Sequence, residues 1–190
     1  QVLTPMRKGL LGVERLNHIL QQYLNPKDTK KAEHEVGDRI FREGDKVMQI
    51  RNNYDLSWER ENNGMRQEGS GVYNGDIGRI EKIDPTQECM IIRFDDRVVS
   101  YDFSLVDELE LAYAVTVHKS QGSEYPVVIL PIYRFSPRLM TRNLLYTAVT
   151  RASEMVILVG DEEQVKAMVD NNRQSKRYSA LAKRLSTYEA

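Results

Sequence analysis

Two short segments of this chain concentrate side chains that bind phosphate and sugar groups. The first, Ala112–Tyr125, holds hydroxyl, imidazole, ammonium and carboxylate groups together with a glycine. The second, Arg142–Ala152, places an arginine, Arg151, behind a helical pattern that is otherwise built for burial. Ammonium and guanidinium groups neutralise phosphate oxygens, carboxylates accept hydrogen bonds from hydroxyls, and glycine lets backbone approach a ligand closely. The combination predicts contacts with a nucleotide or with a nucleic-acid backbone.

Arg151 follows a helical pattern in which Leu145, Ala148 and Val149 share one apolar face. A guanidinium at that helix end can stabilise the charge that develops on a γ-phosphate during phosphoryl transfer. The alternative is an ordinary arginine at the negative end of a helix dipole. Considered without its neighbours, Arg151 is better explained as an ordinary arginine at a helix end. The residues around it decide between this role and a phosphate-facing one.

The first segment ends in a glycine and a carboxylate, Gly122 and Glu124. Gly122 allows close backbone approach to a sugar or phosphate, and Glu124 can accept hydrogen bonds from ribose hydroxyls. The alternative is a glycine that ends a short helix and a solvated carboxylate. On spacing alone, this alternative is favoured.

Four polar residues earlier in the segment are candidates for contacts with nucleic-acid phosphates: Thr116, His118, Lys119 and Ser120. Thr116 can cap a short helix predicted at 116–121, while its neighbours hydrogen-bond phosphate oxygens. Asn143 either reaches the same strand or caps the next helix.

The residues that usually cradle ATP are missing from the sequence. A phosphate-binding loop needs Gly-Lys followed by Ser or Thr, and none of the 11 glycines precedes a lysine. The acidic pair that would hold magnesium cannot be placed either. A single cysteine, Cys89, excludes an internal disulfide and a Cys-rich metal site. We therefore expect the chain alone to bind neither ATP nor a metal.

Both ends of the chain show apolar strands alternating with helices, which predicts a parallel sheet covered on both faces. Strands are expected at 2–3, 111–115, 127–130 and 155–159, and helices at 13–23, 116–121, 141–151 and 161–170. The polar residues 27–37 are expected to form a linker.

The middle of the chain has a different pattern. Short apolar-rich segments separated by turn residues predict a small barrel or sandwich, with strands at 40–41, 46–50, 78–83, 90–94 and 98–101. Residues 55–71 are rich in polar residues and glycine, so we expect a mobile loop there. Asn74-Gly75 is a strong hairpin-turn signal. Tyr54 and Tyr73 can stack on bases, although aromatics in small barrels are more often core residues.

Charge is distributed unevenly along the chain. Residues 36–110 hold 10 Lys and Arg against 17 Asp and Glu, whereas residues 111–160 hold 5 against 2. The charge distribution thus gives no sign of a generic basic nucleic-acid module, and any phosphate contact must come from a local patch near 116–151. No apolar run is long enough to span a membrane. The opening residues resemble no leader, so we expect a piece of a longer cytoplasmic protein.

Together the two segments resemble the last conserved motifs of superfamily-1 helicases, most closely the RecD-like DNA helicases of the exodeoxyribonuclease V alpha-subunit type. The resemblance is strongest in Thr116–Gly122 and Tyr146–Ala152. Shorter matches are Thr4–Gly9, Asn52–Tyr54 and Val72–Gly78. The resemblance covers nearly the whole chain, but only the second half of such an enzyme.

The resemblance implies an α/β fold in which a small Src-homology-3-like β-barrel is inserted into a RecA-like parallel sheet domain. The second RecA-like motor domain would comprise residues 1–35 and 111–190, and the barrel residues 36–110.

The resemblance also implies roles for single residues. Arg151 and Arg7 would face the phosphates of ATP, and Gly122 and Glu124 would lie against the nucleotide. The DNA-contacting residues would be Thr116, His118, Lys119, Ser120, Asn143 and Asn74. No residue is assigned to a metal.

By resemblance, the chain is the C-terminal motor half of an ATP-dependent DNA helicase that moves 5′-to-3′. The full-length enzyme would use ATP and Mg²⁺. Its partners would be single-stranded DNA, the upstream RecA-like domain of the same protein and the subunits of a helicase–nuclease complex.

A different class of function remains open from the sequence. The chain can also be read as a non-catalytic nucleic-acid-binding or adaptor module with a degenerate motor fold. The intact Arg151, Glu124 and Lys119 argue against degeneracy. A nuclease has no support, because no Asp/Glu/Lys cluster of the nuclease type can be assembled.

Overall fold

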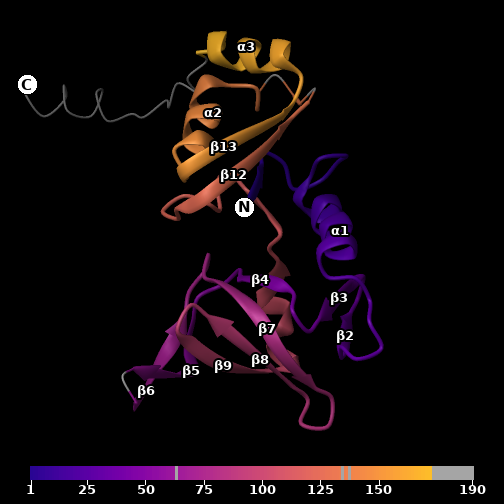
Figure 1. The fold of residues 1–190 in the computed structure, drawn as a ribbon, viewed down its shortest axis with the longest axis vertical. Helices are drawn as coiled ribbons and strands as arrows, with labels where there is room; N and C mark the ends of the chain where they lie inside the picture. The colour runs from indigo at the N-terminus through magenta and orange to yellow at the C-terminus, as the bar shows by residue number, and fades with distance from the viewer. Residues whose placement is uncertain (63, 134, 137, 173–190) are drawn as a thin grey trace, which may run out of the picture.

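The computed structural model describes residues 1–62, 64–133, 135–136 and 138–172. It consists of a parallel sheet with helices and a separate antiparallel barrel, drawn above and below one another in Figure 1. The helix α1 (Val13–Leu24) runs from the level of the parallel sheet toward the barrel. The predicted fold class is confirmed. The part of the predicted motor domain beyond residue 172 lies outside the described residues.

Both ends of the described chain contribute strands to the parallel sheet. Its order is β11-β1-β12-β13, and every neighbouring pair is parallel. The strands are β1 (Val2–Thr4), β11 (Ala114–Thr116), β12 (Tyr125–Ile132) and β13 (Ala152–Gly160).

Two helices follow the last strands of this sheet. α2 (Arg142–Val149) packs against β12 and β13, and α3 (Glu162–Asp170) packs against α2. The side chain of Thr141 caps α2 by accepting a hydrogen bond from the Leu144 amide. The sequence predicted a sheet covered on both faces. Met155, Leu158 and Val159 of the edge strand β13 are nevertheless exposed, so the described helices do not cover both faces of this strand.

The barrel is a seven-stranded antiparallel sheet with the order β10-β4-β7-β8-β9-β5-β6. Its strands are β4 (Lys46–Gln49), β5 (Asn53–Asn62), β6 (Met65–Val72), β7 (Ile77–Asp84), β8 (Cys89–Phe94), β9 (Arg97–Asp102) and β10 (Leu109–Leu111). A 3₁₀ helix, η1 (Phe103–Glu108), joins the last two strands. A separate hairpin of β2 (Glu33–Val36) and β3 (Arg39–Arg42) precedes them.

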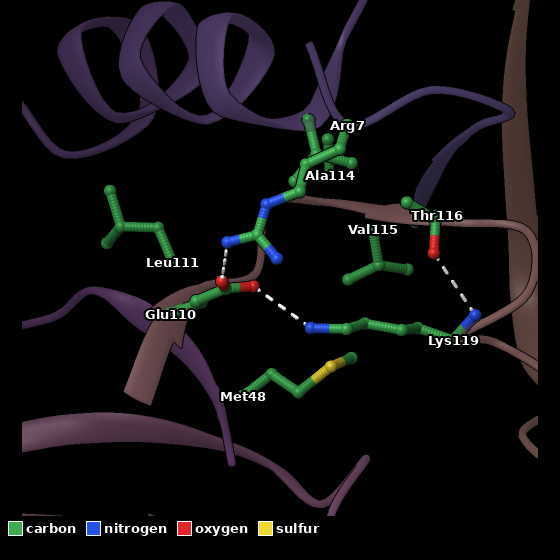
Figure 2. Close-up of a pocket in the computed structure, with 9 residues that line it drawn as sticks. Arg7, Met48, Glu110, Leu111, Ala114, Val115, Thr116 and Lys119 are labelled. Atoms are coloured by element: carbon green, nitrogen blue, oxygen red, sulfur yellow. Dashed lines mark hydrogen bonds and ion pairs between the residues drawn. The ribbon is translucent and has the colours of Figure 1, made fainter. Parts of the chain in front are cut away.

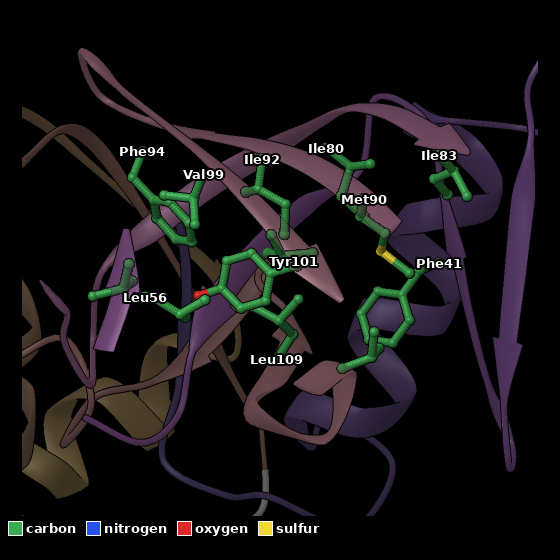
Figure 3. Packing of buried hydrophobic residues seen from close by; sticks show 13 residues of the cluster. Phe41, Leu56, Ile80, Ile83, Met90, Ile92, Phe94, Val99, Tyr101 and Leu109 are labelled. Carbon is green, nitrogen blue, oxygen red and sulfur yellow. The ribbon is translucent and has the colours of Figure 1, made fainter. Parts of the chain in front are cut away.

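Tyr101 lies at the centre of the barrel core (Figure 3). The surrounding residues are alternate, inward-facing positions of the strands, as expected of a sheet with one buried face. The fully buried Tyr101 hydroxyl donates a hydrogen bond to Gln49 Oε1 at 2.8 Å. Burial raises the pKa of this phenol, which keeps it a neutral donor.

Side chains of α1 and of its C-cap residue form hydrogen bonds with the two segments where the chain enters and leaves the barrel. Asn17 donates to the carbonyls of Leu111 and Ala114 at 2.7 and 3.0 Å and accepts from the Ala114 amide at 2.7 Å. Gln21 and Asn25 donate to the fully buried carboxylate of Asp45, at 2.5 and 2.7 Å. These contacts attach the barrel to α1.

The prediction of a mobile loop at 55–71 is wrong. Residues 55–62 and 65–71 belong to the paired strands β5 and β6, whose described register shifts between Asn53 and Ser57. Trp58 packs against the barrel core, and its ring lies over Gly69, where a Cβ atom would collide with it. The polar side chains form cross-strand pairs, such as Arg60 Nε to Gln67 Oε1 at 2.8 Å. Polarity here marks the solvent face of a hairpin.

Four further local predictions need correction. Residues 33–36 of the expected linker form β2. The helix expected at 116–121 is absent, because Thr116 ends β11 and residues 117–121 form hydrogen-bonded turns. Asn74-Gly75 joins β6 to β7, which are not neighbours in the sheet, so this turn closes no hairpin. Tyr54 and Tyr73 form an edge-to-face pair at 5.8 Å on the surface, and neither is a core residue.

Candidate nucleotide and nucleic-acid site

Arg151 lies in the turn between α2 and β13, where its guanidinium faces the loop that precedes β12. Its Nη1 donates to the carbonyl of Ser123 at 3.2 Å, and its backbone carbonyl accepts from the Tyr125 amide at 2.8 Å. Its buried Nε has no hydrogen-bond partner among the described residues. The fold thus brings the predicted arginine to the predicted Gly122–Glu124 loop.

Gly122 and Glu124 are both exposed. Gly122 has a φ of +88°, a left-handed conformation that favours glycine, and a Cβ atom there would meet no neighbour. The Glu124 side chain contributes to a surface pocket with Tyr125 and the barrel residues Gly75 and Asp76. Backbone and carboxylate are therefore open to a ligand beside Arg151.

The Tyr125 hydroxyl is a second buried polar atom without a partner in the described part of the chain. Burial raises the pKa of this phenol, so the group is a neutral hydrogen-bonding group. No motif in the sequence singles out this tyrosine.

Arg7 and Lys119 meet at one carboxylate, that of Glu110 (Figure 2). Arg7 pairs with Glu110 and, through Nε, with Glu14 at 3.2 Å. Lys119 Nζ lies 3.0 Å from the other Glu110 oxygen. The Glu110 carboxylate raises the pKa of Arg7 above its usual value. Sequence reasoning missed Glu110, since a lone Glu in an acidic segment carries no signal of its own.

The short helix that Thr116 was expected to cap is absent, and the Thr116 side chain instead stabilises the turns after β11. Its Oγ1 accepts from the Lys119 amide at 3.2 Å. Ser120 differs from the expectation: it is fully buried, and its hydroxyl donates to the Val117 carbonyl at 2.8 Å. In this structure, Ser120 stabilises the turn and does not present its hydroxyl to solvent.

His118 and Asn143 are exposed and line one shallow pocket together with Arg138 and Thr147. Thr141 is the N-cap of α2, so the capping role considered for Asn143 is wrong. Asn74 lies apart from them, on the barrel, where its amide donates to Asn52 Oδ1 at 2.9 Å. The ten predicted residues thus fall into separate groups, and the fold places no single cleft around all of them.

The described residues contain no group of His, Cys, Asp and Glu that could hold a metal ion. Among them, no helix is long and apolar enough to cross a membrane.

Comparison with known proteins gives matches over most of the chain. Residues 16–94 match the profile of the ATP-dependent RecD-like DNA helicase SH3 domain, and residues 111–159 match that of the UvrD-like helicase C-terminal domain. The ATP-dependent RecD2 DNA helicase of Deinococcus radiodurans is 33% identical over 99% of this chain and 24% of its own length. The RecBCD enzyme subunit RecD of Mycolicibacterium smegmatis is 29% identical over 97% of this chain and 29% of its own length.

Among solved structures, the Bacteroides Pif1 helicase in complex with ADP-AlF3 and single-stranded DNA has a similar fold. Its TM-score is 0.54 at 17% identity, over 100% of this chain and 45% of that one. This likeness supports the arrangement of parallel sheet and barrel. The chain spans about a quarter of the length of the curated relatives it matches.

Proposed function

Because this chain belongs to the RecD-like superfamily-1 DNA helicases, we propose that it forms the C-terminal motor half of an ATP-dependent DNA helicase. The upstream RecA-like domain of the same protein supplies the phosphate-binding loop and the Mg²⁺ ligands. The motor acts on single-stranded DNA in the cytoplasm with 5′-to-3′ polarity, alone or within a helicase–nuclease complex.

One observation supports this proposal above the others: Arg151 faces the Gly122–Glu124 loop with its Nε buried and unpartnered in the described chain. A buried guanidinium nitrogen without an acceptor is costly and fits an anionic ligand. In the proposal, Arg151 acts as an arginine finger on the γ-phosphate, and Glu124 accepts hydrogen bonds from the ribose. Arg7 serves as a second phosphate-facing arginine.

The DNA side of the proposal consists of Lys119, Thr116, His118 and Asn143, with Asn74 on the barrel. These groups neutralise or hydrogen-bond backbone phosphates, which positions the strand without reading its sequence. Ser120 shapes the turn that presents Lys119. When ATP is bound between the two motor domains, hydrolysis supplies the free energy for stepwise movement along the strand.

The proposal predicts that this chain alone has no ATPase activity, whereas a protein that joins it to the upstream domain does. The reason is that the sequence has no Gly-Lys dipeptide and hence no phosphate-binding loop. Steady-state phosphate release, with and without single-stranded DNA, measures the ATPase activity of the chain alone and of the joined protein. DNA-stimulated turnover by the purified chain alone, or no turnover by the joined protein, would contradict the proposal.

A second prediction concerns Lys119. Its replacement by Ala should weaken single-stranded DNA binding about equally for oligonucleotides of different sequence and reduce the salt slope by about 1, because one phosphate contact is lost. Fluorescence anisotropy titrations at several salt concentrations provide the measurement. The matched control is Lys166→Ala on α3, which removes a surface lysine paired only with Glu162 within its own helix. A loss that depends strongly on sequence would point to base readout instead.

A further inference from the structure

Glu110 occupies an unusual place between two cations that the proposed function gives to different ligands. It lies on β10, the last strand of the barrel, while Arg7 follows β1 and Lys119 follows β11. Figure 2 shows the carboxylate between the guanidinium and the ammonium group, one oxygen toward each. The Glu110 side chain is only 18% exposed, so its two ion pairs are partly shielded from water.

The two ion pairs are not independent. Each cation attracts the carboxylate and repels the other cation, so removing one strengthens the hold of Glu110 on the one that remains. Low exposure makes this effect larger than it would be between fully solvated charges. Glu14 provides a contrast, because in the described part of the chain its carboxylate pairs with Arg7 and not with Lys119, and its side chain is 51% exposed.

We propose that Glu110 couples the nucleotide site to the DNA site antagonistically. A γ-phosphate that draws Arg7 away leaves Glu110 entirely to Lys119, which is then less available to a DNA phosphate. A DNA phosphate that draws Lys119 away in turn leaves Glu110 entirely to Arg7. Such coupling is reciprocal by thermodynamic necessity. This inference rests on the proposed function, because it takes Arg7 as nucleotide-facing and Lys119 as DNA-facing.

The consequence is a motor domain that loosens its grip on the strand when ATP arrives. Arg7 and Lys119 come from different loops of the motor domain, and Glu110 comes from the barrel. The barrel would therefore take part in the ATP cycle through the carboxylate of Glu110.

The test uses the full-length protein and a fluorescent single-stranded oligonucleotide. The dissociation constant is measured with and without a saturating non-hydrolysable ATP analogue, in low salt, for wild type, Glu110→Gln and Glu14→Gln. The readout for each protein is the dissociation constant with the analogue divided by the dissociation constant without it. Contributions of the upstream domain to this ratio cancel between variants. The isosteric Gln removes the charge and keeps the shape, and a melting curve for each variant verifies folding.

We expect the analogue to weaken DNA binding more in wild type than in Glu110→Gln, so that the wild-type ratio is about fivefold larger. A factor of this size is the low end of typical allosteric coupling. Glu14→Gln should keep the wild-type ratio, because Glu14 does not touch Lys119. Equal ratios for wild type and Glu110→Gln, in a protein with DNA-stimulated ATPase activity, would overturn this inference and leave the proposed function standing. A wild type without DNA-stimulated ATPase activity would overturn the proposed function, and this inference with it.

Discussion

Replacing Arg151 with Ala in the full-length protein should lower the ATPase turnover number by about 10³-fold or more, while the KM for ATP changes little. An arginine that acts on the charge developing during phosphoryl transfer contributes to the transition state and hardly to ground-state binding. Arginine fingers are worth about 10³–10⁵ in rate. Unwinding of duplex DNA should be lost together with hydrolysis.

The Arg151 experiment needs two companion variants. Arg151→Lys should restore little activity, since an ammonium lacks the planar fork that holds two phosphate oxygens. Arg142→Ala is the matched control: Arg142 begins the same helix, at the end away from the Gly122 loop, and donates to the Val169 carbonyl at 2.5 Å. Steady-state ATPase assays with saturating single-stranded DNA, beside melting curves, decide the outcome. Near-wild-type turnover in Arg151→Ala would make this arginine structural.

The largest expected effect on stability comes from Asp45. Its fully buried carboxylate accepts hydrogen bonds from Gln21, Asn25, the Arg42 amide and the Tyr113 hydroxyl, at 2.5 to 2.8 Å. Asp45→Ala removes the acceptor of all four hydrogen bonds. The Gln21 and Asn25 amides keep bonds to the Ile40 and Glu43 carbonyls, whereas the Arg42 amide and the Tyr113 hydroxyl lose their acceptor. Each buried donor left without an acceptor costs about 1–3 kcal/mol. We expect the free energy of unfolding to fall by about 3 kcal/mol or more.

For a protein of this size, a loss of that order lowers Tm by roughly 6–12 °C. Chemical denaturation and thermal melting of this chain measure both quantities. The control is Asp55→Ala, at an exposed position of the barrel, where a change within about 0.5 kcal/mol is expected. A similar small change in Asp45→Ala would show that water replaces the carboxylate at little cost.

The fold was predictable where strands are continuously apolar. β12 and β13 stand out because their apolar residues are nearly continuous, which is typical of parallel strands, although much of β13 is exposed among the described residues. The β5–β6 hairpin was missed, because a strand needs apolar residues only on its buried face, and β6 supplies Gly69 there, opposite Trp58. Local patterns do not record such cross-strand partners.

The candidate site was predictable in part. The residues of the two motifs can be named from the sequence, and the fold brings Arg151 to the Gly122 loop. Glu110 could not be found, because its partners are 103 and 9 residues away, on two different loops. Ser120 was expected to face a phosphate, but its hydroxyl donates to a carbonyl of its own turn. The local sequence does not distinguish a serine that stabilises a turn from one that faces a ligand.

The entry and exit of the barrel lie side by side. β4, its first strand, pairs with β10, its last, so that Val47 is opposite Leu111, and the Ala112 amide donates to the Lys46 carbonyl at 2.8 Å. An insertion whose ends meet leaves the host sheet undisturbed, whatever its length. A short turn in its place would let the chain pass from α1 directly to β11. The barrel strands between β4 and β10 can thus differ in length without moving the two points at which the chain enters and leaves the barrel.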